Sequence, residues 1–394
     1  MQAEATEVPV FEGDMFSEAA LKDPFPHYRQ LRDLGPIVYL NKLNMYGIGR
    51  YDDVKMALRS SDRLISGEGI GMNPLINDLE GRPKNIITTD GAAHARMKRP
   101  LLRSIGPKPI ESYRDQLKNL ISAHTEELIG TGWFDGVASL AHFLPVSVIS
   151  HLVGLPDEGR ENMLRWASST FNFIGPNLDN LEEDIAAFQE VNEFLGSVPE
   201  DSMKEGSWAD DLFKAAERGD LEIFEARGAL ATYVLPALDT TIFAKANLIY
   251  NLGSNPDQWA KLKADPGLIK SAVYEGVRHS ATVRAFSRFA KSDYREGDVF
   301  VPEGERVVLF FGAANRDERK YEDPDAFRVD RNPRDNLGWG HGDHLCAGMF
   351  LARLEMEVML EAIIEQVETI EVDSPVYGTN QGLYGLDSMK VRLS

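Results

Sequence analysis

The chain has 394 residues, 43% of them hydrophobic, which is enough for a large buried core. Its 62 acidic and 42 basic residues give a formal net charge of −20, which argues against nucleic acid or an anionic membrane as a partner. No apolar run is long enough to span a membrane, the N-terminal segment lacks the features of a signal peptide, and the single cysteine agrees with a reducing compartment. We therefore expect a cytoplasmic protein.

The N-terminal part predicts short helices and strands in alternation. A helix is expected over about 26–34, ended by glycine and proline and followed by a strand. A second strand is expected over 45–50 and a helix over 51–58. No internal repeat or low-complexity linker interrupts the sequence, so we interpret residues 1–394 as a single domain.

Residues 61–89 are rich in glycine and proline, and a loop of this length inside a compact domain is usually functional. Its GEGIG string, 67–71, lacks the preceding strand and following helix of a phosphate-binding loop, so we reject that interpretation. The next segment places His94 and Lys98 four residues apart, on one helical face, where both could contact an anion. The same segment carries four further cations, Arg96, Arg99, Arg103 and Lys108. These cations form either a solvated helix face or a docking patch for an acidic partner.

A mostly helical body is predicted from residue 109 to about 225, with breaks at Gly132, Gly154, Gly175 and Pro199. Residues 221–253 then have the pattern of one long helix, with Pro236 in its middle. Proline lacks an N–H and clashes with the carbonyl four residues earlier, so a kink is expected there.

Just past the expected kink lie an acid and a hydroxyl, Asp239 and Thr240. The threonine either satisfies a helix carbonyl locally or forms a proton relay with the acid. Farther on, the helix predicted over 267–279 holds Glu275 and Arg278, three residues apart, as a local ion pair. The C-terminal QGLYGLDSMKVRL predicts a turn and an edge strand.

The decisive stretch is LGWGHGDHLCAGMFLARLE, 337–355, which contains the only cysteine, Cys346. One thiol cannot form an internal disulfide or a structural zinc or iron–sulfur site. Glycines on both sides of this cysteine let the backbone turn sharply and approach a flat ligand closely. They are Gly340 and Gly342 before it and Gly348 after it. The helical pattern that follows places Cys346 at a helix N-terminus, which favours a thiolate over an inert core thiol.

Residues 339–348, WGHGDHLCAG, resemble the haem-binding loop of the cytochrome P-450 family, FGxGxHxCxG, with Trp339 in place of phenylalanine. Asp239 and Thr240 match the family's [AG]Gx[DE]TT pattern, although Pro236 and Ala237 occupy its two small positions. Glu275 and Arg278 match its ExxR element, a structural ion pair. The resemblance implies a mainly α fold with small β-sheets, a triangular helical domain that holds haem between the long central helix and the helix after the cysteine loop.

The resemblance also implies the site residues. Haem b (iron protoporphyrin IX) would be ligated by Cys346 between Gly340 and Gly348, and the indole N–H of Trp339 could donate toward the sulfur. The haem propionates would be held by His94, Lys98, Arg288 and His344, where Lys98 keeps the charge of the family's arginine but loses its bidentate fork. The expected substrate pocket comprises Glu68, Ile70, Met72, Leu75, Ile76, Phe171, Phe173, Leu235, Val283, Ala285, Phe286, Leu383 and Tyr384.

The implied activity is that of a monooxygenase, in which O₂ is activated on the haem, Asp239 and Thr240 deliver protons, and oxygen enters a C–H bond. Electrons would come from NAD(P)H through a ferredoxin and its reductase. Several stretches resemble the bacterial subfamily that oxidises para-substituted aromatic acids such as 4-methoxybenzoate.

The substrate expectation depends on two substitutions. Glu68 stands where that subfamily has a carboxylate-binding arginine, and Leu235 replaces a hydroxyl residue, so we predict a small neutral aromatic substrate, such as a methoxyphenol or alkylphenol. Alternatively, Glu68 is a solvated loop residue. The rival functions are oxidation of a larger terpenoid or macrocycle, a non-catalytic haem-thiolate gas sensor, and a peroxide-driven enzyme.

Overall fold

The computed structural model describes residues 7–73, 77, 85–148, 152–155 and 162–394. Its N-terminal elements follow the sequence pattern closely. The helix expected over 26–34 is α2, and the helix expected over 51–58 is α3. These elements are β1 (Val10–Phe11), α1 (Glu18–Lys22), α2 (Phe25–Leu34), β2 (Val38–Leu40), β3 (Met45–Ile48), α3 (Tyr51–Arg59) and β4 (Leu64–Ile65).

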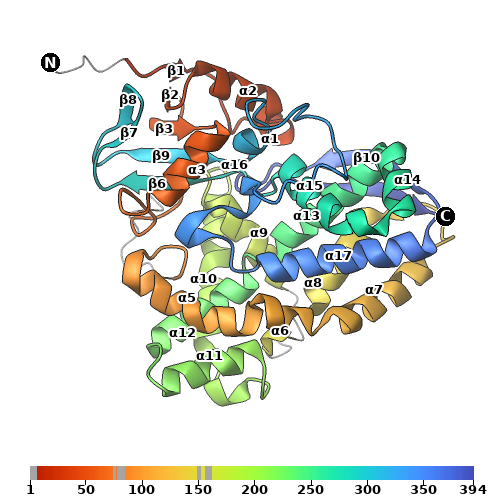
Figure 1. The fold of residues 1–394 in the computed structure, drawn as a ribbon. Coiled ribbons are helices and arrows are strands. Elements are labelled where there is room, and N and C mark those ends of the chain that lie inside the picture. The colour runs from red at the N-terminus through yellow and green to blue at the C-terminus, as the bar shows by residue number, and fades with distance from the viewer. Residues whose placement is uncertain (1–6, 74–76, 78–84, 149–151, 156–161) are drawn as a thin grey trace.

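A six-stranded sheet joins the N-terminal part to the C-terminal third of the chain, at the upper left of Figure 1. Its order is β1-β2-β3-β9-β6-β4, with β6 (Ala285–Ala290) and β9 (Arg306–Phe310) inserted between the N-terminal strands. Leu64 of β4 pairs with Ala290 of β6. The sheet thus places the segment that carries Arg288 beside the loop that begins at residue 61.

Two smaller sheets complete the β structure that the described residues form. β7 (Tyr294–Glu296) pairs with β8 (Val299–Val301). The other sheet has the order β10-β11-β5, formed by Ile370–Tyr377, Leu386–Leu393 and Phe134–Asp135. The C-terminal strand β11 was expected at an edge, but it pairs on both sides because β5, too short to be recognised in the sequence, packs against it.

Helices form the rest of the molecule, at the centre, right and bottom of Figure 1. The breaks expected at Gly132 and Gly154 are present, and both glycines have positive φ, which ends a helix without a Cβ clash. The helices are α5 (Gly91–Ile105), α6 (Pro107–Glu111), α7 (Arg114–Leu128), the π-helix η1 (Val137–Ala141), α8 (Phe143–Val148), α9 (Met163–Phe173), α10 (Leu181–Ser197), η4 (Glu200–Ser202), α11 (Trp208–Glu217), α12 (Ile223–Val234), α13 (Leu238–Ser254), α14 (Pro256–Ala264), η5 (Pro266–Leu268), α15 (Ile269–Ser280), α16 (Phe311–Asn315), η6 (Leu337–Trp339), η7 (Gly342–His344) and α17 (Met349–Gln366).

The long helix predicted over 221–253 is interrupted rather than merely kinked. α12 ends at Val234 and α13 begins at Leu238. Pro236 has no N–H to donate to the carbonyl of Thr232, and the next amide, that of Ala237, donates to Val234 instead, at 3.4 Å. Asp239 and Thr240 therefore lie in the first turn of a new helix.

The largest apolar cluster lies among α7, α13, α15 and α17, with side chains such as Ile121, Leu248, Val273 and Met356 fully buried. α17 packs along α7, as Figure 1 shows, and α13 packs against α15. This packing places the helix that follows Cys346 in one core with the helix that carries Asp239. In the described part of the chain, no helix combines the length and the apolar character needed to cross a bilayer. The mainly helical architecture with small sheets is the one that the sequence predicted.

Candidate functional site

The loop around Cys346 is shaped by two glycines and closed by the start of a helix. Gly340 and Gly342 both have φ +70°, and a Cβ at Gly342 would lie 2.5 Å from the carbonyl oxygen of Leu58. The Cys346 N–H donates to the Trp339 carbonyl at 2.9 Å, which folds the loop back on itself. Gly348 is the N-cap of α17, so the helix begins where the sequence placed it.

The Cys346 residue is exposed, although protein atoms lie densely around its thiol. Burial raises the pKa of this thiol. The N–H groups of Gly348 and Met349 and the charge of Lys98 lower that pKa, but by less. The helix N-terminus therefore does not suffice to make a thiolate here, and a cation bound at the sulfur would have to favour that form.

The four residues expected to hold propionates converge from three separate segments. The rings of His94 and His344 lie 4.2 Å apart, and His94 Nε2 is 3.0 Å from the carbonyl oxygen of Asp343. Lys98 donates to that oxygen at 2.5 Å and to the carbonyl of Leu345 at 3.1 Å. Two histidines and a lysine from α5 and the cysteine loop thus form one group.

Arg288 of β6 belongs to the same group through Asp90, a residue that the sequence analysis missed. Burial lowers the pKa of Arg288 to about 10, and the negative charge of Asp90 partly opposes this shift. His344 Nε2 is 3.3 Å from Asp90 Oδ1, and the backbone N–H groups of Ser66 and Gly67 donate to the Asp90 carboxylate. Burial tends to raise the pKa of Asp90, but these hydrogen bonds outweigh it and lower that pKa.

Asp90 was missed because an aspartate before a helix normally indicates an N-cap. It does occupy the N-cap position of α5, yet its side chain makes no capping hydrogen bond. The carboxylate instead lies among the cationic residues. Only the packing of β6 and the cysteine loop against α5 reveals this role.

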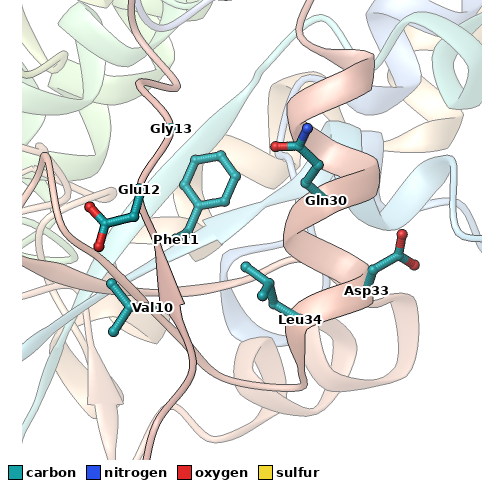
Figure 2. A pocket seen from close by; sticks show the side chains of 7 residues that line it. All are labelled: Val10, Phe11, Glu12, Gly13, Gln30, Asp33 and Leu34. Atoms are coloured by element: carbon teal, nitrogen blue, oxygen red, sulfur yellow. The ribbon is translucent and has the colours of Figure 1, made fainter.

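Two of the surface hollows that the described residues form can be compared. One, of about 580 Å³, lies beside the histidine and lysine of α5 and is lined by Gly91, Ala92, His94, Ala95, Lys98, Arg99, Leu102 and Asp343. The other, of about 490 Å³, lies between β1 and α2 and contains none of the expected site residues, as Figure 2 shows. The first hollow therefore adjoins two of the residues expected to hold the propionates.

The residues around Cys346 fit a haem group. Cys346 is exposed, and cationic and histidine side chains lie together where two carboxylates would need partners. The Trp339 Nε1–H is buried and has no hydrogen-bond partner among the described residues, so it is left to donate to a group at the sulfur.

Asp239 and Thr240 lie at the break between α12 and α13. The Thr240 hydroxyl donates to the Pro236 carbonyl at 2.5 Å, as in the local interpretation of this residue, and its oxygen can still accept a proton donor. Asp239 is 7% exposed. Burial raises the pKa of Asp239 to about 7. A hydrogen bond from Ser168 lowers this pKa, whereas the negative charge of Asp387 raises it.

Glu275 and Arg278 are fully buried and joined by two hydrogen bonds of 2.7 and 2.8 Å. Arg278 also donates to the carbonyls of Asn315 and Pro324. The Asn315 side chain in turn accepts the N–H of Leu337, at the start of the cysteine loop. The pair therefore connects α15 with the loop.

Backbone contacts bring several of the expected pocket residues together. The Ile70 carbonyl accepts a hydrogen bond from the Ser287 N–H at 2.9 Å, and Val283 forms a β-bridge with Leu383. A Cβ at Gly382 would lie 2.5 Å from the Phe171 carbonyl oxygen, so the C-terminal loop also lies against α9. Phe173 stacks on Phe188, and Leu235 is buried at the break before α13.

The remaining expected pocket residues make other contacts. Met72 and Ala285 pack in the apolar cluster of the N-terminal part, because Ala285 and Phe286 alternate on opposite faces of β6. Glu68 is exposed, and its carbonyl accepts from Arg306. Tyr384 stacks on Tyr377 beside Arg284. Leu75 and Ile76 lie outside the described residues.

Comparisons with known proteins agree with this geometry. The family model described as Cytochrome P450 matches residues 267–376. The cytochrome CYP199A2 of Rhodopseudomonas palustris is 32% identical over 391 residues, covering 98% of this chain and 95% of that protein. The beta-dihydromenaquinone-9 omega-hydroxylase of Mycobacterium tuberculosis is 31% identical over 390 residues, covering 97% and 78%.

Solved structures have the same fold. The epothilone D-bound P450epoK superposes with a TM-score of 0.87 at 26% identity, covering 98% of this chain and 99% of that one. The structure of P450BioI in complex with an acyl carrier protein ligated to hexadec-9Z-enoic acid gives a TM-score of 0.85 at 24% identity, covering 96% and 99%. With a relative above 30% identity along almost its whole length, this chain belongs to the cytochrome P-450 family of monooxygenases, which are oxidoreductases that bind haem and O₂.

Proposed function

We propose that this protein hydroxylates or O-demethylates a small neutral aromatic compound, of the methoxyphenol or alkylphenol type. The observation that carries this proposal is the apolar character of the side chains brought together by the Val283–Leu383 bridge. Ile70 and Phe171, from two other segments, add only apolar surface. The similarity to CYP199A2 along the whole chain fits the aromatic-oxidising subfamily that the motifs resemble.

The buried Leu235, which replaces a hydroxyl residue of the aromatic-acid subfamily, is the reason for proposing a neutral substrate. A desolvated carboxylate needs a cationic partner to remain charged. Among the described residues near the pocket, Arg288 lies with Asp90, and Arg284 donates to the carbonyls of Leu383 and Asn380. The Arg284 Nη1 is buried without a hydrogen-bond partner in the described part of the chain, so Arg284 is the cation that a carboxylate substrate would have to reach. Glu68 is exposed and fits the alternative of a solvated loop residue, so the proposal does not depend on its side chain.

We assign the following roles around the haem. When bound, haem supplies the reductive activation of O₂. Cys346, between Gly340 and Gly348, would ligate the haem, and the Trp339 N–H would donate toward the sulfur. The propionates would be held by His94, Lys98, Arg288 and His344.

We assign proton transfer to Asp239 and Thr240. A carboxyl with a pKa of about 7 can both release and take up a proton near neutrality. The Thr240 hydroxyl is oriented by its bond to Pro236, which leaves its oxygen lone pairs free to accept. Glu275 and Arg278 have a structural role only.

Electrons would come from NAD(P)H through a ferredoxin and its reductase. An acidic ferredoxin would contact cations on α5 and near it. Arg96 and Arg103 are engaged by Glu225 and Asp220, which leaves Arg99 and Lys108 as exposed cations without an ion pair among the described residues.

The test is an optical titration of the ferric holoprotein with 4-methoxyphenol and, in parallel, with 4-methoxybenzoate. A shift of the haem iron to high spin with the phenol alone is the expected result, because only a neutral ring can enter the pocket without a cation. A shift with the benzoate alone would contradict the neutral-substrate proposal.

Oxidation of a larger terpenoid or macrocycle is a second candidate. The menaquinone hydroxylase is 31% identical to this chain, against 32% for CYP199A2, and the P450epoK structure contains epothilone D. A high-spin shift with such compounds, and none with small aromatics, would favour this function. Substrate-dependent NADH consumption with ferredoxin and reductase would exclude a gas sensor, and turnover only with peroxide would identify a peroxide-driven enzyme.

A further inference from the structure

The glycine-rich string 67–71, which is not a phosphate-binding loop, has no role in the mechanism above. Glycine loses more conformational freedom on folding than any other residue, so a string with three glycines needs many contacts to keep one conformation. The structure supplies these contacts from outside the loop. Side chains at the start of α5 and on the sheet strands β6 and β9 hydrogen-bond to backbone groups between residues 66 and 71.

Asp90 holds the first part of the string. Its carboxylate accepts the Ser66 N–H at 3.0 Å and the Gly67 N–H at 2.6 Å. A Cβ at Gly67 would lie 2.9 Å from Asp90 Oδ2, so a glycine is needed for this close approach. The same carboxylate lies 3.3 Å from His344 Nε2. The start of the string is therefore tied to the residues expected to hold the propionates.

Arg306 of β9 and Ser287 of β6 hold the second part of the string. Arg306 donates to the carbonyl of Glu68 and, at 3.0 Å, to that of Gly69. Its Nη1 also lies 3.4 Å from Ser287 Oγ, which donates to the Gly71 carbonyl at 2.5 Å. Because a carbonyl can only accept, the hydroxyl hydrogen of Ser287 is directed to Gly71, and its oxygen accepts from Arg306. The two side chains thus form one connected anchor.

Ile70 lies between the backbone groups that this anchor holds. The Ser287 N–H donates to the Ile70 carbonyl at 2.9 Å, so the backbone of Ile70 is also bonded to β6. Its side chain is buried, yet Ile70 belongs to none of the three apolar clusters that the described residues form. The same holds for Phe171 and Leu383, two other residues expected in the pocket. Apolar side chains buried outside the packed core are suited to form the wall of a ligand pocket.

We propose that Ser287 and Arg306 are positioning residues that fix Ile70 as a rigid wall of the substrate pocket and thereby limit the size of the substrate. The backbone is hydrogen-bonded before, at and after Ile70, so this wall cannot move aside for a larger molecule without breaking these bonds. Small aromatic compounds are then preferred over larger ones. The inference rests on the proposed function for the place of Ile70 in the pocket.

The test is a double-mutant cycle on the ferric holoprotein. Imidazole and the larger 4-phenylimidazole both bind a haem iron through nitrogen, and optical titration gives their dissociation constants without any substrate. Ser287→Ala should change the ratio of the two constants by about 5-fold in favour of 4-phenylimidazole, the effect of losing about one net hydrogen bond. Ile70→Ala should change the ratio in the same direction. The double variant should go no further than Ile70→Ala alone, because Ser287 acts through Ile70.

Two further variants separate positioning from a general loosening of the fold. Arg306→Lys keeps the charge but loses the fork of donors, so it should also favour 4-phenylimidazole. Arg295→Lys is the control, because Arg295 lies over the ring of Phe300 in the separate two-stranded sheet. This control should leave the ratio unchanged. An unchanged ratio in Ser287→Ala, additive effects in the double variant, or equal effects of the two arginine variants would overturn the proposal.

The two imidazoles need only the haem iron, so the result does not depend on the aromatic substrate. If 4-methoxyphenol causes no spin shift in the wild-type protein, the proposed function fails, while the cycle still decides the role of Ser287. If Ile70→Ala itself leaves the ratio unchanged, Ile70 does not line the pocket and the inference fails.

Discussion

Single residues around the sulfur show how burial and hydrogen bonding compete. Cys346 lies at the N-terminus of α17, yet burial raises the pKa of its thiol. The Trp339 N–H is the one buried ring donor near this loop that has no partner within the described part of the chain. A donor left unpaired in the interior is costly unless a bound group satisfies it.

Trp339→Phe is expected to lower the reduction potential of the haem iron. An N–H that donates to the thiolate withdraws negative charge from the sulfur and favours the reduced iron. A net hydrogen bond contributes about 1 kcal/mol, equivalent to about 40 mV for one electron. Redox titration of both proteins measures the change. Trp133→Phe, on an exposed indole, is the control, and an unchanged potential in Trp339→Phe would show that the indole donates elsewhere.

At the scale of elements, buried charges hold helices to one another and to the cysteine loop. Glu275 Oε1 accepts from Arg278, from the Arg328 backbone N–H and from Arg331. Between α13 and α17, Lys245 and Glu355 lie 3.6 Å apart, almost without exposure. The first pair is satisfied by several hydrogen bonds, whereas Lys245 Nζ and Glu355 Oε2 have none among the described residues.

Glu275→Gln should destabilise the protein by about 3–5 kcal/mol, because it leaves the Arg278 guanidinium buried without its counter-charge. The free energy of unfolding in denaturant gives the value. Asp293→Asn breaks the exposed pair with Arg295 and should cost less than about 1 kcal/mol. Similar losses in the two variants would mean that Glu275 is not a structural brace.

Replacing both Lys245 and Glu355 by apolar residues, as Lys245→Met with Glu355→Leu, should stabilise the protein near neutral pH by about 1–4 kcal/mol. Burial lowers the pKa of Lys245 and raises that of Glu355, and their mutual attraction only partly opposes these shifts. The single variant Lys245→Met should instead be destabilised, because the buried carboxyl loses its cation.

The pH dependence follows from the directions of these shifts. A raised carboxyl pKa means that stability falls as pH rises from the ordinary glutamate value, about 4.3, through the folded value. A lowered lysine pKa means that stability rises as pH increases toward the ordinary lysine value, about 10.4. The gain in the double variant should therefore be largest near neutrality and shrink on both sides. Unfolding measured from mildly acidic to mildly alkaline pH checks this, and a constant gain would contradict the assignment.

For the whole molecule, the net charge of −20 contrasts with the local cations beside the cysteine loop. Arg99 and Lys98 line the hollow at α5, and Lys108 is exposed nearby. A strongly acidic protein repels an acidic ferredoxin except where such a patch is present.

Arg99→Glu should slow reduction by an acidic ferredoxin, about 10-fold or more at low ionic strength, and the difference should diminish as salt screens the charges. Stopped-flow reduction of the haem at several salt concentrations measures this. Arg218→Glu, an exposed arginine at the end of α11, is the matched charge reversal. An equal effect of both substitutions would indicate a general charge effect rather than a docking patch.

Features that depend on short spacings could be predicted from the sequence. The turn at Gly340 and Gly342, the helix start after Cys346, the break at Pro236 and the Glu275–Arg278 pair all follow from local geometry. The family motifs rest on these spacings, so the fold class and the family were predictable. The single-domain interpretation and the haem and substrate roles of individual residues stay predictions.

Three-dimensional packing determines which distant residues surround the site. Asp90 meets His344 across 254 positions of sequence. Packing also places Met72 and Ala285 in the N-terminal apolar cluster and gives β11 a second partner. Such contacts, and the burial that raises the pKa of Cys346, depend on how whole elements pack against one another, which short spacings in a sequence do not encode.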